Sequence, residues 1–238
     1  MSTCLQTDGS GLVVAKGSPA FGLDDFTLET WIKPTAAGVI MSNKSTEGGN
    51  QWEENAGFVF SVGADGALHI AVDNGQAFYA VDSAPTMLFD GNWHHVTSGR
   101  SGFDLHLFMD GQELQTTTNN SGTADSMSLD QTASLALSAR PEAVDFMAGY
   151  FSEARVWTIF LTVAQIQANM YTRLTGKEAG LVILWPFSSA VVDELTGAYP
   201  SETQGNCTFP TSDCPIDNPP PEEADEAEEA EESFEPEA

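Results

Sequence analysis

The chain has 238 residues and a formal net charge of −27, which comes from 35 acidic and 8 basic residues. Charge of this sign repels phosphate backbones and anionic lipid headgroups, so we expect neither nucleic-acid binding nor binding to acidic membrane surfaces. No run of about 18 apolar residues predicts membrane insertion, and the amino terminus lacks the basic start and apolar stretch of a secretory signal peptide. An apolar fraction of 41% is sufficient for a sizeable core.

Short apolar or alternating segments follow one another from residue 5 to about residue 161, with turn residues between them. Strands that recur about every 8 to 12 residues, separated by Gly- and Asp-rich turns, are typical of an all-β sandwich. The sequence therefore predicts an antiparallel sandwich. The expected strands are residues 12–15, 26–33, 39–41, 57–62, 67–72, 77–81, 93–98, 104–109, 135–137, 151–157 and 181–187.

Glycine turns predict how some of these strands pair. Asp90-Gly91 and Asp110-Gly111 border the alternating runs around residues 93–98 and 104–109. Glycine adopts positive φ without steric cost, so Asp-Gly next to alternating runs is a strong hairpin signal. The segment 63–66, with a glycine at each end, predicts a second hairpin between residues 57–62 and 67–72.

One helix is expected after the strands, over residues 161–170. Thr162 is a suitable N-cap and Gly176 a suitable stop. Helical spacing predicts one apolar face. Its members are Leu161, Ala164, Ile166, Met170 and Leu174.

The composition changes at about residue 203, where Pro, Asn and Thr and then Glu and Ala dominate. Residues 217–238 hold 11 acidic residues and no basic ones. Such a segment cannot bury enough apolar area to offset its ordering entropy. We therefore expect a domain over residues 1–202 and a disordered or nascently helical tail over 203–238. The tail would act as a solubilising segment or, alternatively, would contact a protein or calcium.

The three cysteines leave two alternatives open. Cys207 and Cys214 lie seven residues apart in a segment rich in Pro, Thr and Asp, while Cys4 is distant in the sequence. A small-loop disulfide between Cys207 and Cys214 would indicate an oxidising compartment. The alternative is two free thiols in a loop.

Four motifs occur in order between residue 5 and about residue 200. They are residues 26–34 (FTLETWIKP), 93–96 (WHHV) with 108–111 (FMDG), 149–157 (GYFSEARVW), and 180–187 (GLVILWPF). Together they resemble the laminin-G-like and pentraxin-like domains of the concanavalin A-like lectin superfamily. The resemblance implies an all-β jelly-roll sandwich with one short C-terminal helix. It also implies an extracellular type of binding module rather than an enzyme.

Residues that could support catalysis do not form a pattern. A retaining glycoside hydrolase needs two carboxylates about 5 to 5.5 Å apart, and the E-x-D-x-x-E spacing of jelly-roll glucanases is absent. Members of the family often carry Asp-Glu where this chain has Ser152 and Glu153. His94 and His95 are adjacent on a strand, so they face opposite sides and we expect them to be structural. We predict no catalytic residue.

The long polar loop over residues 42–57 contains several oxygen-bearing side chains, which suit calcium. The resemblance implies that Glu54 and Asn55 occupy the place of calcium ligands in pentraxin-like relatives. A second family loop corresponds to residues 139–145, and it makes Glu142 and Asp145 candidate ligands. The alternative is two solvated loops that hold no ion.

Candidate ligand-binding residues come from the same two loops. Trp52 could stack on a sugar or anchor its loop on the sheet, and Arg140 could pair with a nearby carboxylate or contact an anionic ligand. The remaining candidates are Asn43, Asn50 and Asn55.

We therefore expect a lectin-like module that binds a glycan or glycoprotein, with Ca²⁺ as a candidate cofactor and an oligomer as a candidate assembly. The alternatives are a protein-interaction or adhesion domain and, less favoured, a glycan-cleaving enzyme.

Overall fold

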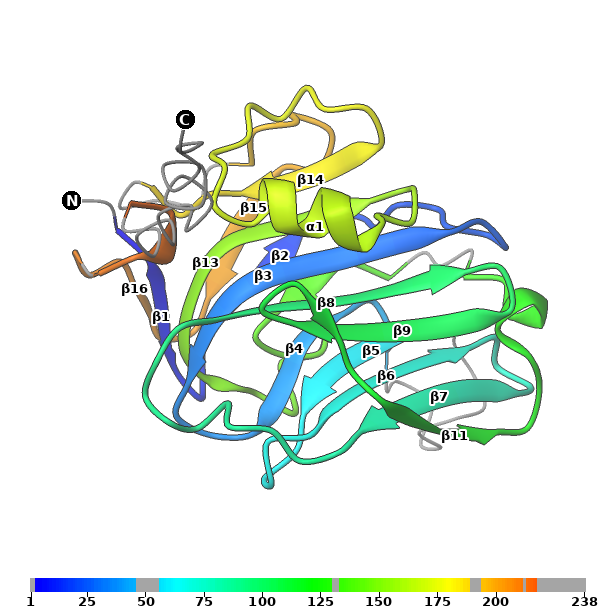
Figure 1. The fold of residues 1–238 in the computed structure, drawn as a ribbon. Helices are drawn as coiled ribbons and strands as arrows, with labels where there is room; N and C mark the ends of the chain where they lie inside the picture. Colours follow the sequence, from blue (N-terminus) through cyan, green and yellow to red (C-terminus); the bar gives the residue numbers. More distant parts are fainter. Residues whose placement is uncertain (1–2, 46–55, 130–132, 189–193, 212, 218–238) are drawn as a thin grey trace, which may run out of the picture.

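A computed structural model of the protein describes residues 3–45, 56–129, 133–188, 194–211 and 213–217. Two eight-stranded sheets pack face to face, and a short helix, α1 (Val163–Asn169), lies against the outer side of one of them (Figure 1). The named strands pair antiparallel throughout. The prediction of an all-β sandwich with one short helix is confirmed.

Sheet I is the sheet that carries α1. Its strand order is β10-β9-β8-β3-β13-β1-β16, and β14 pairs with β13 beside β1. The strand bounds are β1 (Leu5–Asp8), β3 (Phe26–Pro34), β8 (His94–Ser101), β9 (Asp104–Met109), β10 (Gln112–Glu113), β13 (Ala148–Trp157), β14 (Leu181–Trp185) and β16 (Cys207–Thr208).

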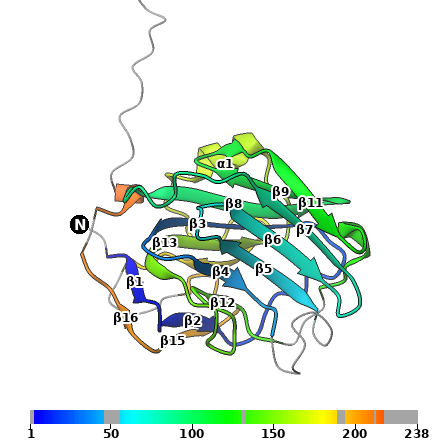
Figure 2. The same ribbon diagram turned by 90° about the horizontal axis from the view of Figure 1, so that it is seen from below.

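Sheet II forms the other layer, and Figure 2 looks at the molecule from its side. The strand order is β11-β7-β6-β5-β4-β12-β2-β15. The strand bounds are β2 (Leu12–Ala15), β4 (Gly38–Ser42), β5 (Gly57–Val62), β6 (Leu68–Asp73), β7 (Phe78–Ser83), β11 (Thr116–Asn120), β12 (Ala136–Leu137) and β15 (Ser201–Gln204). Two 3₁₀ turns complete the elements, η1 (Ala124–Ser126) and η2 (Pro215–Asp217).

The core lies between the sheets and follows the period-two pattern of the strands. From sheet I, Phe26, Leu28 and Ile32 of β3 point inward, and from sheet II, Phe58 and Phe60 of β5 meet them. All five are fully buried. Burying one such side chain contributes about 1.5 to 3 kcal/mol. Along β5, β6 and β7 buried residues alternate with half-buried ones, so the outer face of these strands remains available for a ligand.

Both predicted hairpins are present. The first joins β8 to β9, which pair antiparallel from Val96 with Met109 to Ser101 with Asp104. Asp110 (φ 51°) and Gly111 (φ 72°) follow β9 as the two-residue turn to β10, and two positive φ values are the signature of a type I′ turn. The carboxylate of Asp110 also accepts from the backbone N–H of His95. The second hairpin joins β5 to β6 through residues 63–67, where the N–H of Gly63 donates to the carbonyl of Ala67.

Helix α1 and its two caps lie within the predicted residues 161–170, but the helix does not continue to Gly176. Thr162 caps it in a capping box with Gln165, and Met170 is its C-cap, so the expected stop at Gly176 is wrong. Ile166 is buried, whereas Ala164, expected on the apolar face, is exposed. A helix of two turns has room for only one deeply buried position against the sheet.

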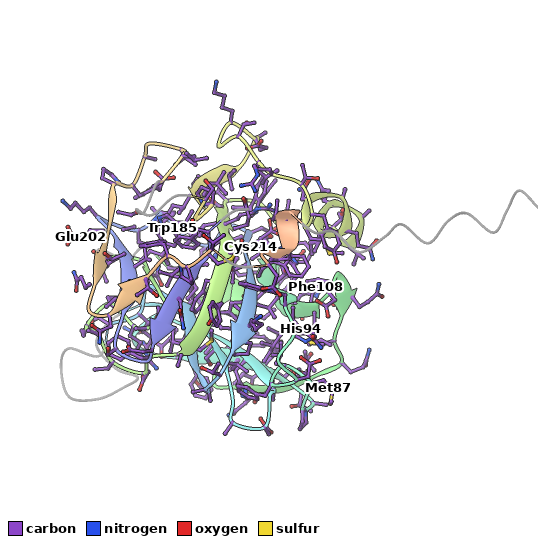
Figure 3. The ribbon with its side chains drawn as sticks, turned by 90° about the vertical axis from the view of Figure 1, so that its left-hand side faces the viewer. Met87, His94, Phe108, Trp185, Glu202 and Cys214 are labelled. Atoms are coloured by element: carbon purple, nitrogen blue, oxygen red, sulfur yellow. A yellow bond between two sulfur atoms is a disulfide. The ribbon has the colours of Figure 1, made fainter. Side chains whose placement is uncertain are left out.

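The sandwich continues past the expected domain boundary at residue 202. Strand β15 spans that boundary, and β16 pairs with β1. Cys214 forms a disulfide with Cys4 (Figure 3), which corrects the expectation of a bond between Cys207 and Cys214. Cys207 is a free, half-buried thiol. Residues 203–211 and 213–217 are therefore attached to the sandwich, and the rest of the acidic tail lies outside the described residues.

Candidate functional site

A cavity of about 280 Å³ lies on the outer face of sheet II, over β5, β6 and β7. Its floor is a row of residues paired side by side across four strands, namely Val59, Ala71, Ala80 and Asn119. The two alanines in the middle of the row have short side chains, so the surface is hollow there. We call this cavity the sheet II groove.

A second cross-strand row lines the groove with polar groups. Ser61 pairs with His69, and His69 pairs with Asp82. The Nδ1 of His69 lies 2.7 Å from Oδ1 of Asp82. Ser61 Oγ and His69 Nε2 make no hydrogen bond within the described part of the chain. The row therefore presents hydrogen-bonding groups to a ligand.

A buried ion pair closes another side of the groove. The Nζ of Lys44 lies 3.3 Å from Oδ1 of Asp73, and both side chains are almost completely buried. Burial lowers the pKa of Lys44, Asp73 raises it, and repulsion from Arg140 lowers it further. Lys44 and Arg140 are thus close enough to repel one another at this side of the groove.

Arg140 is supplied by the loop between β12 and β13. Its Nε donates to Oδ2 of Asp145 over 2.7 Å. Ser138, Ala143 and Asp145 in this loop have φ values of 73°, 59° and 57°. Positive φ is strained for residues other than glycine, persists only where the surroundings enforce it, and is concentrated at functional sites.

A neighbouring cavity of about 420 Å³ extends the groove across β5. It shares Val59, Ser61, His69 and Arg140 with the first cavity and continues to Phe146. The two cavities therefore form one depression that runs across the strands, with Arg140 lining both parts.

The expected ligand-binding residues separate into three groups. Asn43 is fully buried, donates to Ser18 Oγ and accepts from the N–H of Phe58, so it supports β5 and is not available to a ligand. Arg140 lines the groove as just described. The remaining candidates, Asn50, Trp52 and Asn55, lie outside the described residues.

The expected calcium ligands are not brought together by the described residues. Asp145 is bound by Arg140 and lines the extension of the groove, whereas Glu142 lines a different cavity with Ser45. Glu54 and Asn55 lie outside the described residues. Within those residues, no group of three His, Cys, Asp or Glu side chains could hold a metal ion. Glu142 retains one feature of a ligand, since its Oε2 is buried and has no hydrogen-bond partner among the residues that the structure describes.

His94 and His95 lie on opposite sides of β8, as predicted. His94 is held between Asp110, 2.8 Å from its Nδ1, and Asp90, 3.2 Å from its Nε2. These two carboxylates raise its pKa. His95 is fully enclosed against Trp31, and burial lowers its pKa to about 3. Both side chains have structural partners.

Ser61, His69 and Asp82, which form the groove's polar row, are not among the candidate residues expected from the sequence. Each of these residues occupies an outward position on a strand whose alternate residues are apolar. That alternation could have identified them as surface residues. Their alignment into one row depends on the pairing of β5, β6 and β7, which the sequence does not state.

No helix among the described residues is long and apolar enough to cross a membrane.

The comparisons with known proteins agree with the fold. The family described as the concanavalin A-like lectin/glucanases superfamily matches residues 7–167. A candidate carbohydrate-binding protein from Bacteroides ovatus superposes with a TM-score of 0.62 at 16% identity, over 90% of this chain and 61% of that one. None of the curated proteins matches.

Two further solved structures are similar. The heptameric SAP-like pentraxin of Limulus polyphemus has a TM-score of 0.55 at 18% identity, over 86% of this chain and 95% of that one. Domains LG4-5 of the mouse laminin α1 chain have a TM-score of 0.51 at 19% identity, over 80% of this chain and 46% of that one. At these identities the likeness concerns the fold.

Proposed function

Because the chain belongs to the concanavalin A-like lectin/glucanase superfamily, we propose that it is a carbohydrate-binding module whose ligand lies in the sheet II groove. The observation that carries this proposal is the pair of cross-strand rows. One row gives an apolar floor at Val59, Ala71 and Ala80, and the other gives hydrogen-bonding groups at Ser61, His69 and Asp82. A sugar ring has the matching chemistry, with an apolar face and a rim of hydroxyl groups.

The size of the groove supports a short saccharide. A volume of about 280 Å³ is at the lower end of small-molecule sites, and the extension across β5 leaves space for a further ring. Phe78 contributes an aromatic ring to the lining, and Asn119 contributes an exposed amide at the opposite end of the floor.

Binding is favoured over catalysis by the groups in the groove. Its described carboxylates are already engaged, Asp73 with Lys44 and Asp82 with His69. A glycosidase needs one free acid and one free base on either side of the bond that it breaks. The B. ovatus candidate carbohydrate-binding protein supports the same assignment by its fold.

The test is a glycan array followed by titration of the strongest ligand with two matched variants. Asn119 and Asn120 are adjacent, exposed and chemically identical, but only Asn119 lines the groove. We expect Asn119→Ala to weaken binding about tenfold, which is the change in affinity expected when one or two hydrogen bonds to the ligand are lost. Asn120→Ala should bind as the wild type. Equal effects of the two variants, or an array without signal, would exclude the groove as a glycan site.

A protein-interaction or adhesion domain is the second candidate, and one observation favours it. Among the described strands, β11 is at the edge of sheet II and pairs with β7 alone, and it is exposed along its whole length. Exposed edges can accept a strand from a partner. A glycan array without signal, together with a partner whose binding is lost on Thr118→Pro, would support this function.

Calcium dependence is a separate part of the proposal. Glu142 offers a buried carboxylate oxygen without a partner, in a cavity that Ser45 also lines. Ca²⁺ requires six to eight oxygen ligands, so Glu142 alone does not form a site, and Asp145 is engaged by Arg140. Ligands from Glu54 and Asn55 would have to complete the coordination.

A further inference from the structure

We infer that the sheet II groove recognises an acidic sugar, whose carboxylate or sulfate group binds the guanidinium of Arg140 directly. The inference rests on the proposed function, because it assigns the ligand class of the same groove. It concerns a contact between protein and ligand that does not pass through calcium.

The unused donors of Arg140 are the main observation. A guanidinium carries five N–H donors in a fixed planar fork. Arg140 uses its Nε for Asp145, whereas Nη1 is buried without a hydrogen-bond partner. Nη2 has no bond within the described part of the chain either. The two N–H donors of Nη1 are thus buried without an acceptor among the described residues, and the two of Nη2 have no protein acceptor there, on a side chain that is only 12% exposed.

Leaving such donors unpaired has a free-energy cost, because burial removes them from water without supplying an acceptor. A carboxylate or sulfate satisfies two of the donors at once through a bidentate contact. Since Arg140 lines both cavities, an acidic group placed at their junction would meet the fork while its ring lies over the floor of Val59 and Ala71.

The charges around Arg140 agree with this assignment. Asp145 is 54% exposed, so water screens much of its interaction with Arg140. Lys44 lies close enough to repel Arg140, and its own partner Asp73 is fully buried beside it. One side of the groove therefore holds two cations, each paired with one carboxylate, in a chain that has only eight basic residues. An oxyanion between these cations would reduce their repulsion.

A neutral sugar is the competing ligand. A hydroxyl group can accept from one Nη donor, but it supplies no charge and occupies only part of the fork. The two ligand classes differ in one measurable way. If the groove recognises an acidic sugar, removing the negative charge from the ligand while retaining its ring should abolish recognition. If the groove recognises a neutral sugar, the same change should leave binding unchanged.

The first experiment compares matched probes and needs no variant. Uronic-acid oligosaccharides are tested against their carboxyl-reduced forms, and sulfated oligosaccharides against their desulfated forms, at about 0.15 M salt so that the net charge of the chain is screened. All measurements are made in EDTA. We expect one acidic form to bind about ten to a hundred times more tightly than its neutral counterpart. The pair that shows the difference identifies carboxylate or sulfate.

The second experiment assigns the contact to Arg140. R140K keeps the charge and removes the fork, R140Q removes both, and K177Q removes one charge from the segment that follows α1. We expect R140K and R140Q each to lose most of the preference for the acidic probe, with K177Q unchanged. Thermal melting shows whether each variant is folded. If R140Q does not fold, the comparison of acidic and neutral probes on the wild-type protein still tests the acidic ligand.

The outcomes separate the two proposals. Equal binding of acidic and neutral forms would overturn the acidic ligand and leave the groove as a site for neutral glycans. An acidic preference that persists in both R140K and R140Q would overturn the role of Arg140. Binding of no glycan in either arm would overturn the proposed function and this inference with it.

Discussion

Arg155 and Glu29 form an ion pair in which both side chains are fully buried, with 3.3 Å between Nη1 and Oε1. They face each other across the pairing of β13 with β3. The same guanidinium donates to the carbonyls of Asn169 and Thr172, and Trp157 Nε1 donates to Glu29. This pair therefore fastens the end of α1 to the outer face of sheet I.

Removing one partner of this pair should be strongly destabilising. Arg155→Met leaves the carboxylate of Glu29 buried without its cation, which costs about 3 to 5 kcal/mol. Urea unfolding monitored by tryptophan fluorescence measures the loss. Lys16→Met is the control, because Lys16 pairs with Glu202 over 3.8 Å at an exposed position and should change the unfolding free energy by about 1 kcal/mol or less. Equal losses for the two variants would contradict the role of the buried pair.

The sequence predicts strands well where apolar residues alternate. The hairpin of β5 and β6 and the segment that forms β3 are examples. Strand β11 was not expected, because Thr116–Asn120 is polar and exposed on both faces and has no alternation. Helix α1 ends before the expected stop at Gly176, and the buried guanidinium of Arg155 donates to the carbonyls of Asn169 and Thr172 at this end.

The candidate site could be predicted only in part. Arg140 was singled out because basic residues are rare in this chain, and the structure places it in the groove. The floor of the groove required the alignment of Ala71 with Ala80 and of Ala80 with Asn119, which depends on strand pairing. Asn43 was expected to bind a ligand, and this prediction is wrong. Its side chain is buried and accepts from the backbone N–H of Phe58 inside the protein.

The disulfide between Cys4 and Cys214 should be detectable by counting thiols. In denaturant without reductant we expect one thiol per chain, from Cys207, and three after reduction. Cys214→Ser should lower the unfolding free energy by about 2 to 5 kcal/mol, because the bond closes a long loop. Cys207→Ser is the matched control and should have little effect. Three reactive thiols in the unreduced protein would show that the bond does not form.

Calcium binding predicts a shift in melting temperature. If Glu142 with Glu54 and Asn55 holds an ion, then about 1 to 5 mM Ca²⁺ should raise the melting temperature by several degrees relative to EDTA, by mass action. Glu142→Gln should remove the rise. Asp145→Asn should leave it, because Arg140 already engages Asp145. An unchanged melting temperature in the wild type would remove calcium from the proposal.

The two adjacent histidines of β8 should give stability profiles of opposite slope. Asp110 and Asp90 raise the pKa of His94 in the folded state, so its stabilisation is present below the unfolded value of 6.5 and is lost as the pH rises through the folded value. Burial lowers the pKa of His95 to about 3, with Arg155 and Glu29 beside it. Its neutral form is favoured by folding, so stability is lost as the pH falls below about 6.5.

Unfolding free energies measured between about pH 5 and pH 9 test this difference. The destabilisation caused by His94→Gln should be larger at the acidic end of the range than at the alkaline end. The destabilisation caused by His95→Gln should be smaller at the acidic end, because the wild type has by then lost stability through His95. The lowered pKa of Asp90, about 2 in the folded state, contributes only below this range. Profiles of the same slope for both variants would show that one of the two histidines is not in the environment that shifts its pKa, with the carboxylates around His94 or the burial of His95 absent.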